Sequence, residues 1–148
     1  MLMQDAAPAF WHHHVGISVP DIAASIAWYG DVLGFALERR YFAESIPGEI
    51  AILRNGPLHV ELFQLADAQA LPPGRREPDS DLRTHGNKHV AFAVEDVQAF
   101  AAILKQRGAD IVWVKKFAFG ANAFIRDNAG NLIEFVQKDR IAEAEGRL

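Results

Sequence analysis

The alternation of apolar and polar residues repeats in the two halves of the chain. The stretches "HVGISVPDIAASIAWYGDVLGF", from His14, and "HVAFAVEDVQAFAAILKQRGAD", from His89, both begin with a short period-two alternation. In a strand, that period places His14 and His89 on a face of small residues, with the larger apolar residues on the opposite face. Both stretches then change to the spacing of an amphipathic helix. We therefore predict a strand and then a helix at the start of each half.

Each predicted helix has recognisable end signals. Asp21 and Asp96 precede the helical spacing, and a short carboxylate there accepts a free backbone N–H of the first turn. Gly34 and Gly108 follow it, and glycine readily takes the left-handed conformation that closes many helices. Three short strands are then predicted in each half, at 36–43, 49–53 and 58–65 and at 111–117, 121–126 and 132–137, with "RNGP" and "DNAGN" as turns. Each half is therefore predicted as one strand, one helix and three strands.

The two halves are predicted to form one domain over residues 1–148. We expect a first module at 11–65 and a second at 88–138, because neither half alone has enough apolar residues for a separate core. The segment 66–87 is rich in proline and charge, which predicts an exposed linker loop. The polar tail at 139–148 is expected to fray.

Composition and charge exclude several classes of protein. Half of the 148 residues are hydrophobic and 23% are charged, as in a globular protein, and no stretch approaches the roughly 20 apolar residues of a membrane span. The absence of cysteine excludes disulfides and thiolate sites, and no secretory signal is recognised, so we expect a cytoplasmic protein. The net charge of −4 and scattered basic residues argue against a nucleic-acid partner. No phosphate-binding loop, dinucleotide fingerprint or serine-hydrolase motif occurs.

Two glutamates interrupt apolar strands at matching positions. "LHVELFQ" contains Glu61 and "NLIEFVQ" contains Glu134, each in the middle of a predicted last strand. A carboxylate there is costly to bury unless it is paired or binds a metal. His14 and His89 also occupy matching positions, so two imidazoles and two carboxylates form a candidate site for Zn²⁺, Ni²⁺, Co²⁺, Mn²⁺ or Fe²⁺. Packing of the halves about a pseudo-twofold axis would bring the four together.

The remaining polar and aromatic candidates are less regular. Strand alternation predicts His13 on the face opposite to His14, with His12 exposed at the entrance. His59 lies two residues before Glu61 and therefore on the same face. Candidate substrate-binding residues are His59, Trp113, Asn122 and Phe124, and Trp11, Phe117 and Phe119 are further candidates for the cavity wall. No arginine is identified as a clamp for a carboxylate or for glutathione.

The chain resembles the vicinal oxygen chelate superfamily over about residues 11–138. The resemblance is carried by the duplicated unit, by "GNKHVAFAVEDV" and above all by "FIRDNAGNLIEFVQ". This superfamily includes glyoxalases, extradiol dioxygenases and bleomycin-resistance proteins. Its last motif commonly reads D-P-x-G-N-x-x-E, and this chain has Asn128 in place of the proline while Glu134 stays in register. The resemblance implies an α+β fold in which paired βαβββ modules form an open, incomplete β-barrel with the helices packed outside. It also implies a divalent metal, a small-molecule substrate and a homodimer.

The resemblance further implies a role for each polar residue. His14, Glu61, His89 and Glu134 fall on the metal-ligand positions, and a retained Glu61 favours the lyase and isomerase branch. In that branch the metal chelates vicinal oxygens of the substrate and stabilises an enediolate-type oxyanion. Glu134 is the first candidate for a ligand that doubles as general base, and Glu61 is the second.

Two alternatives remain open at this point. An extradiol-type dioxygenase or a thiol transferase would need only His14, His89 and Glu134. A metal-free binding protein of the bleomycin-resistance type would need none of the four, and the presence of all four positions in this chain argues against it.

Overall fold

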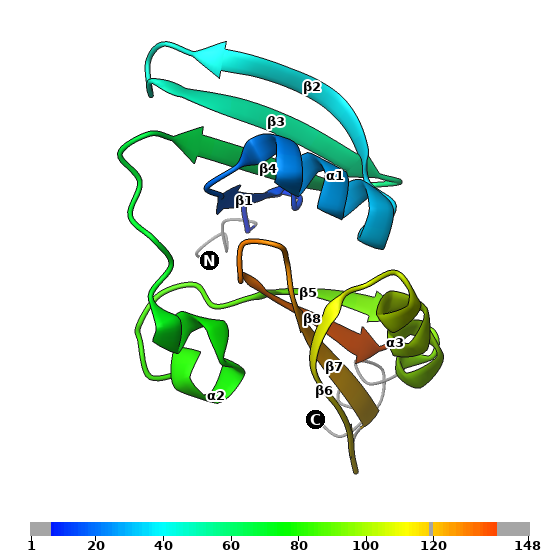
Figure 1. Cartoon of the computed structure of the whole chain (residues 1–148). Coiled ribbons are helices and arrows are strands. Elements are labelled where there is room, and N and C mark those ends of the chain that lie inside the picture. The colour runs from blue at the N-terminus through cyan, green and yellow to red at the C-terminus, as the bar shows by residue number, and fades with distance from the viewer. Residues whose placement is uncertain (1–6, 119, 139–148) are drawn as a thin grey trace, which may run out of the picture.

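The chain folds into two four-stranded sheets, each crossed by one helix (Figure 1). The computed structural model describes residues 7–118 and 120–138, so Phe119 and the predicted tail at 139–148 lie outside the described residues. The first half contains β1 (Val15–Ser18), α1 (Ile22–Leu33), β2 (Ala36–Ala43), β3 (Gly48–Asn55) and β4 (Leu58–Leu65). The second contains β5 (Val90–Val94), α3 (Val97–Gln106), β6 (Asp110–Phe117), β7 (Gly120–Arg126) and β8 (Leu132–Gln137).

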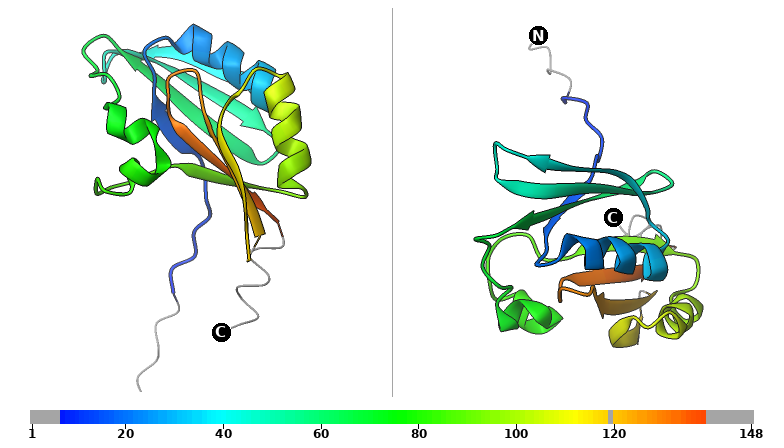
Figure 2. Two further views of the ribbon diagram at one scale, coloured as in Figure 1. Left: turned by 60° about the horizontal axis from the view of Figure 1, so that its bottom comes forward. Right: turned by 45° about the horizontal axis from the view of Figure 1, so that its top comes forward.

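The two sheets share one topology. Their strand orders are β1-β4-β3-β2 and β5-β8-β7-β6, with the first strand of each half parallel to the last and the other pairs antiparallel. Even the irregularities match, because the register shifts between Leu37 and Arg39 in β2 and between Ile111 and Trp113 in β6. Figure 2 shows the two long helices on one side of the sheets, while the segment 7–14 leaves from the other side. Two open sheets with helices outside confirm the predicted α+β fold.

Both long helices are fixed at their N-termini in the same way. The carboxylates of Asp21 and Asp96 each accept the backbone N–H three residues further on, as predicted for N-caps. Gln64 near the end of β4 and Gln137 at the end of β8 each accept the first N–H of the helix in their own half through Oε1. Each helix is therefore tied to the last strand of its sheet.

One apolar core joins the two halves. Buried side chains of α1, β3 and β4 form a continuous cluster with those of α3, β7 and β8. The ring centroids of Phe35 and Phe92, one from each half, lie 6.5 Å apart. Across the same boundary the Tyr29 hydroxyl donates to Oδ2 of Asp127 at 3.0 Å, and Ser25 donates to Asn128 at 3.0 Å.

The segment 66–87, predicted as an exposed linker loop, is mostly exposed and contains two short helices that the sequence pattern did not show. It contains a 3₁₀ helix, η1 (Pro73–Arg76), and a short helix, α2 (Pro78–Asp81). The prolines that suggested a loop stand at the starts of these helices, where the missing N–H costs no hydrogen bond. None of the helices in the described part of the chain is long and apolar enough to cross a bilayer.

The first prediction concerns the buried Tyr29–Asp127 hydrogen bond. Tyr29→Phe removes the donor, and we expect the free energy of unfolding at neutral pH to fall by about 1–3 kcal/mol in urea titrations. Burial, together with the charge of Asp127 and its hydrogen bond, raises the pKa of Tyr29 well above 10.0. The wild-type stability from this neutral hydroxyl is therefore complete below pH 10 and is lost as the pH rises above it.

The matched control uses the second of the two tyrosines. In the Tyr41→Phe variant all tyrosinate absorbance comes from Tyr29, so a pH titration follows that hydroxyl alone. Ionisation of Tyr29 in folded protein at or below pH 10, or a Tyr29→Phe variant as stable as wild type, would contradict the prediction.

Candidate metal centre

The first half presents a preformed pair of His14 and Glu61. His14 directly precedes β1, and Glu61 lies in the middle of β4, whose parallel register pairs it with Gly16. His14 is two residues before Gly16, so both side chains project from the same face of the sheet. His14 Nε2 and Glu61 Oε2 lie 2.9 Å apart, and the two side chains are 39% and 17% exposed. The pair is accessible from solvent.

The second half repeats this arrangement with His89 and Glu134. Here the register pairs Glu134 with Ala91, two residues after His89. His89 Nε2 and Glu134 Oε2 lie 3.0 Å apart, with the side chains 26% and 13% exposed. The two pairs therefore occupy equivalent positions, because the parallel strand register is the same in both halves.

The two pairs are separate in the single chain. Among residues 7–118 and 120–138, no three His, Cys, Asp or Glu side chains gather closely enough to hold a metal ion. His14 and His89 nevertheless line the same cleft of ≈ 1270 Å³, which follows β1 and the start of β5. Since β1 and β5 are the terminal strands of their sheets, the cleft lies where the two halves face each other.

Three of the predicted substrate-binding residues surround the second pair. Asn122 donates through Nδ2 to Glu134 Oε1 at 2.9 Å and accepts from the Trp113 indole N–H at 3.3 Å. The Phe124 ring stands edge-on to the rings of His89 and Trp113, with centroids 4.8 and 5.1 Å apart. Asn122 and Phe124 are only 7% and 5% exposed, so their visible role is to hold the His89–Glu134 pair.

The first pair lacks this support. Ile50 in β3 stands at the position that Asn122 has in β7, because Ile50 pairs with Phe63 as Asn122 pairs with Val136. An isoleucine cannot donate a hydrogen bond, so it offers Glu61 no equivalent of the contact between Asn122 and Glu134. The two carboxylates occupy matching positions but differ in how firmly they are held.

Two further histidines lie beside the first pair. The fourth predicted substrate-binding residue, His59, has its Nε2 3.4 Å from Glu38 Oε2. The His13 ring stacks on His59 with centroids 6.1 Å apart, and its Nδ1 lies 2.6 Å from that of His14. The prediction that His13 points to the face opposite to His14 was wrong, because these contacts place its ring beside His59 and His14.

The cleft also has a basic lining that the sequence did not reveal. Arg75, Arg76 and Lys88 line it, all from the segment between the two sheets or its junction with β5. The only signal in the sequence was the charge of "PGRREPD", which is equally typical of an exposed loop. Two of the aromatic wall candidates, Trp11 and Phe117, are 84% and 39% exposed and lie outside the cleft lining.

Comparison with known proteins decides the family. A sequence profile of the Glyoxalase/Bleomycin resistance protein/Dioxygenase superfamily matches residues 11–135. The chain belongs to this superfamily. The matched region includes the whole first module, the second module as far as residue 135, and all four residues of the His–Glu pairs.

Individual known proteins resemble the chain along most of its length. Protein YaeR of Escherichia coli (strain K12) is 30% identical over 131 residues, which cover 85% of this chain and 95% of YaeR. A glyoxalase family protein from Enterococcus faecalis has a TM-score of 0.73 at 23% identity, covering 86% of this chain and 97% of that one. The trypanothione-dependent glyoxalase I of Leishmania major has a TM-score of 0.70 at 22% identity, covering 94% of each chain. The two structures support the fold.

The second prediction tests the support of Glu134 by Asn122. In a double-mutant cycle of Asn122→Ala and Glu134→Ala, we expect a coupling free energy of about 0.5–3 kcal/mol in urea unfolding, because the two side chains share a hydrogen bond. The matched cycle in the first half, Ile50→Ala with Glu61→Ala, should give a coupling below about 0.5 kcal/mol. Equal coupling in the two cycles would contradict the asymmetry described above.

Proposed function

We propose that this member of the superfamily is a divalent-metal-dependent lyase or isomerase that acts on a small substrate with adjacent oxygen atoms. The observation that carries the proposal is the duplicated His–Glu pair, one on each sheet at the same register. A cation bound there would act as a Lewis acid and stabilise negative charge that develops on a substrate oxygen.

The residues present fit such a cation. His14 and His89 each offer an imidazole nitrogen, and Glu61 and Glu134 each offer carboxylate oxygens, a donor set suited to Zn²⁺, Ni²⁺, Co²⁺, Mn²⁺ or Fe²⁺. Asn122 hydrogen-bonds Glu134 as an outer partner, which is how carboxylate ligands are commonly oriented. The two pairs stand apart in the described residues, but both histidines line one cleft, so we propose that a bound cation draws the four residues of one chain together into a single centre.

The two carboxylates are suited to different tasks. Glu134 is held at Oε2 by His89 and at Oε1 by Asn122, which favours a fixed ligand. Glu61 contacts His14 and has Ile50 where Asn122 would stand, which leaves it freer to turn toward a substrate and accept a proton. The resemblance favoured Glu134 as the general base, whereas these contacts favour Glu61.

The third prediction concerns metal uptake. We expect purified protein to bind one Zn²⁺, Ni²⁺, Co²⁺, Mn²⁺ or Fe²⁺ per chain after dialysis, measured by elemental analysis and, for Co²⁺, by its visible spectrum. Alanine at His14, His89 or Glu134 should abolish stoichiometric uptake, because each removes one of few ligands. The exposed His85→Ala and Glu44→Ala variants are the matched controls. A wild-type protein that keeps no metal would refute the proposal.

Mixed variants show whether one chain supplies the whole centre. The double variant His14→Ala/Glu61→Ala is unfolded and refolded with His89→Ala/Glu134→Ala, and metal content is measured again. We expect no recovery, because each chain lacks half of its own ligands. Recovery toward a quarter of the wild-type metal content would show instead that a homodimer completes each site across two chains, because half of the dimers are mixed and each mixed dimer has one intact site. That result would overturn the single-chain arrangement.

The fourth prediction separates the two glutamates. With a small substrate that bears adjacent oxygen atoms and is turned over by metal-loaded wild type, we expect Glu61→Gln to retain metal and lose turnover by about 10²–10⁴-fold, as for a general base. Glu134→Gln should lose metal affinity as well. The reverse pattern would assign the base to Glu134. Oxygen-dependent ring cleavage of a catechol by Fe²⁺-loaded Glu61→Ala protein would favour the three-ligand dioxygenase.

A further inference from the structure

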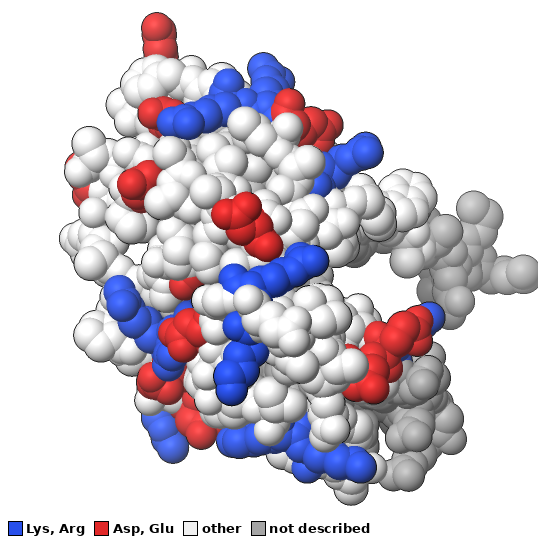
Figure 3. Space-filling view, turned by 45° about the vertical axis from the view of Figure 1, so that its right-hand side comes forward, with Lys and Arg blue, Asp and Glu red and all other residues white. Residues whose placement is uncertain are grey.

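The cleft between the two halves is lined by basic side chains and by no carboxylate among the described residues. Its ionisable lining residues are His12, His14, Arg75, Arg76, Lys88 and His89. This composition is unusual for a chain with a net charge of −4. The face shown in Figure 3, by contrast, carries acidic and basic side chains close to one another.

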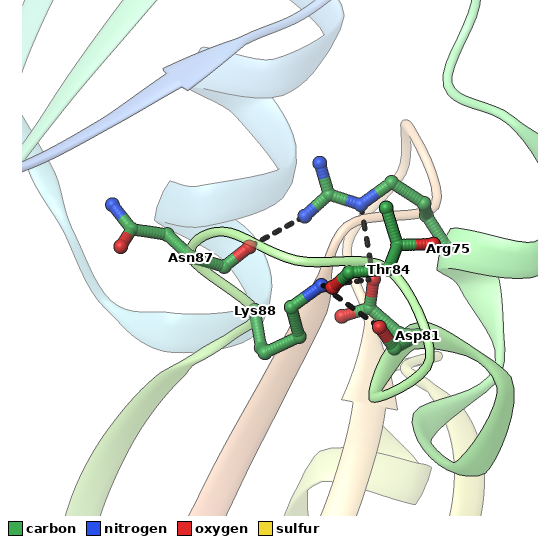
Figure 4. A network of polar contacts seen from close by, with 5 residues as sticks. All are labelled: Arg75, Asp81, Thr84, Asn87 and Lys88. Carbon is green, nitrogen blue, oxygen red and sulfur yellow. Dashed lines mark hydrogen bonds and ion pairs between the residues drawn. The ribbon is translucent and has the colours of Figure 1, made fainter.

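A buried carboxylate fixes two of these basic groups. Asp81 is 2% exposed, and its Oδ1 accepts from Arg75 Nε at 2.9 Å and lies 3.4 Å from Lys88 Nζ (Figure 4). Lys88 Nζ also donates to the backbone carbonyls of Asp81, at 2.8 Å, and of Thr84. A buried carboxylate is tolerated because it is paired with two cations. The three N–H groups of Lys88 are thereby used within the protein.

This network orients the Arg75 guanidinium but leaves one of its nitrogens without an acceptor. Its Nε binds Asp81 and its Nη2 donates to the carbonyl of Asn87 at 2.6 Å. Its remaining nitrogen, Nη1, has no acceptor among the described residues and carries no dashed contact in Figure 4. The guanidinium is therefore oriented on two sides and keeps donors for a third partner.

Arg76 adds a second such group. Its guanidinium packs on Gly130 of the β7–β8 turn, where φ is +91° and a β-carbon would come within 3.1 Å of Arg76 Nε. Glycine at this position leaves room for the arginine. The side chain has no acceptor among the described residues, so Arg75 and Arg76 together offer unpaired N–H donors at one cleft.

We propose that the cleft binds the anionic group, a carboxylate or a phosphate, of a small ligand, with Arg75 and Arg76 as its donors. Guanidinium groups match the geometry of both anions and bind them with two parallel hydrogen bonds. That this ligand is the substrate rests on the proposed function. His14 and His89 line the same cleft as the arginines, so an anion held at the arginines belongs to a molecule that also reaches the candidate metal centre. The substrate class is then an acidic small molecule.

The fifth prediction tests the cleft in chelator-treated, metal-free protein, so that its outcome is independent of metal uptake. Inorganic phosphate and succinate are titrated separately at constant ionic strength, and amide shifts are followed by NMR. We expect saturable shifts in the cleft residues with at least one of the two probes. Response to phosphate alone identifies a phosphate-bearing ligand, and response to succinate alone identifies a carboxylate.

Variants show whether the arginines are the donors. Arg76→Gln leaves the Asp81 network intact, and we expect it to weaken binding at least tenfold. Arg75→Lys keeps the charge but loses the planar fork, and it should weaken binding similarly. The exposed Arg83→Gln, outside the cleft lining, should bind like wild type. Absence of saturation with both probes, or equal affinity in Arg76→Gln and Arg83→Gln, would overturn the proposal even where metal uptake is normal.

Discussion

Parallel pairing between the first and the last strand of each half places the histidine and the glutamate of that half side by side. It sets Gly16 opposite Glu61 and Ala91 opposite Glu134, so the histidine two residues before each small residue lies beside a carboxylate. A shift of one residue in either pairing would turn the glutamate toward the helix and the apolar core. The register is therefore tied to the stability of the core and to the candidate metal centre at the same time.

The same pairing also fixes the helices. Gln64 and Gln137 follow the glutamates by three residues and accept the first N–H of α1 and α3. Being three residues away, each glutamine lies on the opposite face of its strand from the glutamate, and this is the face on which the helix packs. One strand in each half thus supplies a candidate ligand on one face and a helix anchor on the other.

Much of this could be predicted from the sequence, because it depends on local periodicity. Strands at 36–43, 58–65 and 132–137 have the predicted bounds, since alternation and turn residues mark both of their ends. Periodicity misplaced the His13 side chain, and it did not show the two short helices within the segment 66–87. Arg75 and Lys88 could not be assigned to a cleft, because their positions depend on contacts with the buried Asp81.

The two halves share one fold but differ in the residues that surround their glutamates. Two identical modules would hold their glutamates in the same way, and the two carboxylates would then have the same role. Asn122 against Ile50, and Trp113 against Arg39 at the matching bulge, break that equivalence on the site face of the sheets. Hydrogen bonds restrict Glu134, while the apolar neighbour places no such restriction on Glu61. On the proposed function, this asymmetry suits Glu134 to the role of a fixed metal ligand and Glu61 to the role of a base that accepts a proton from the substrate.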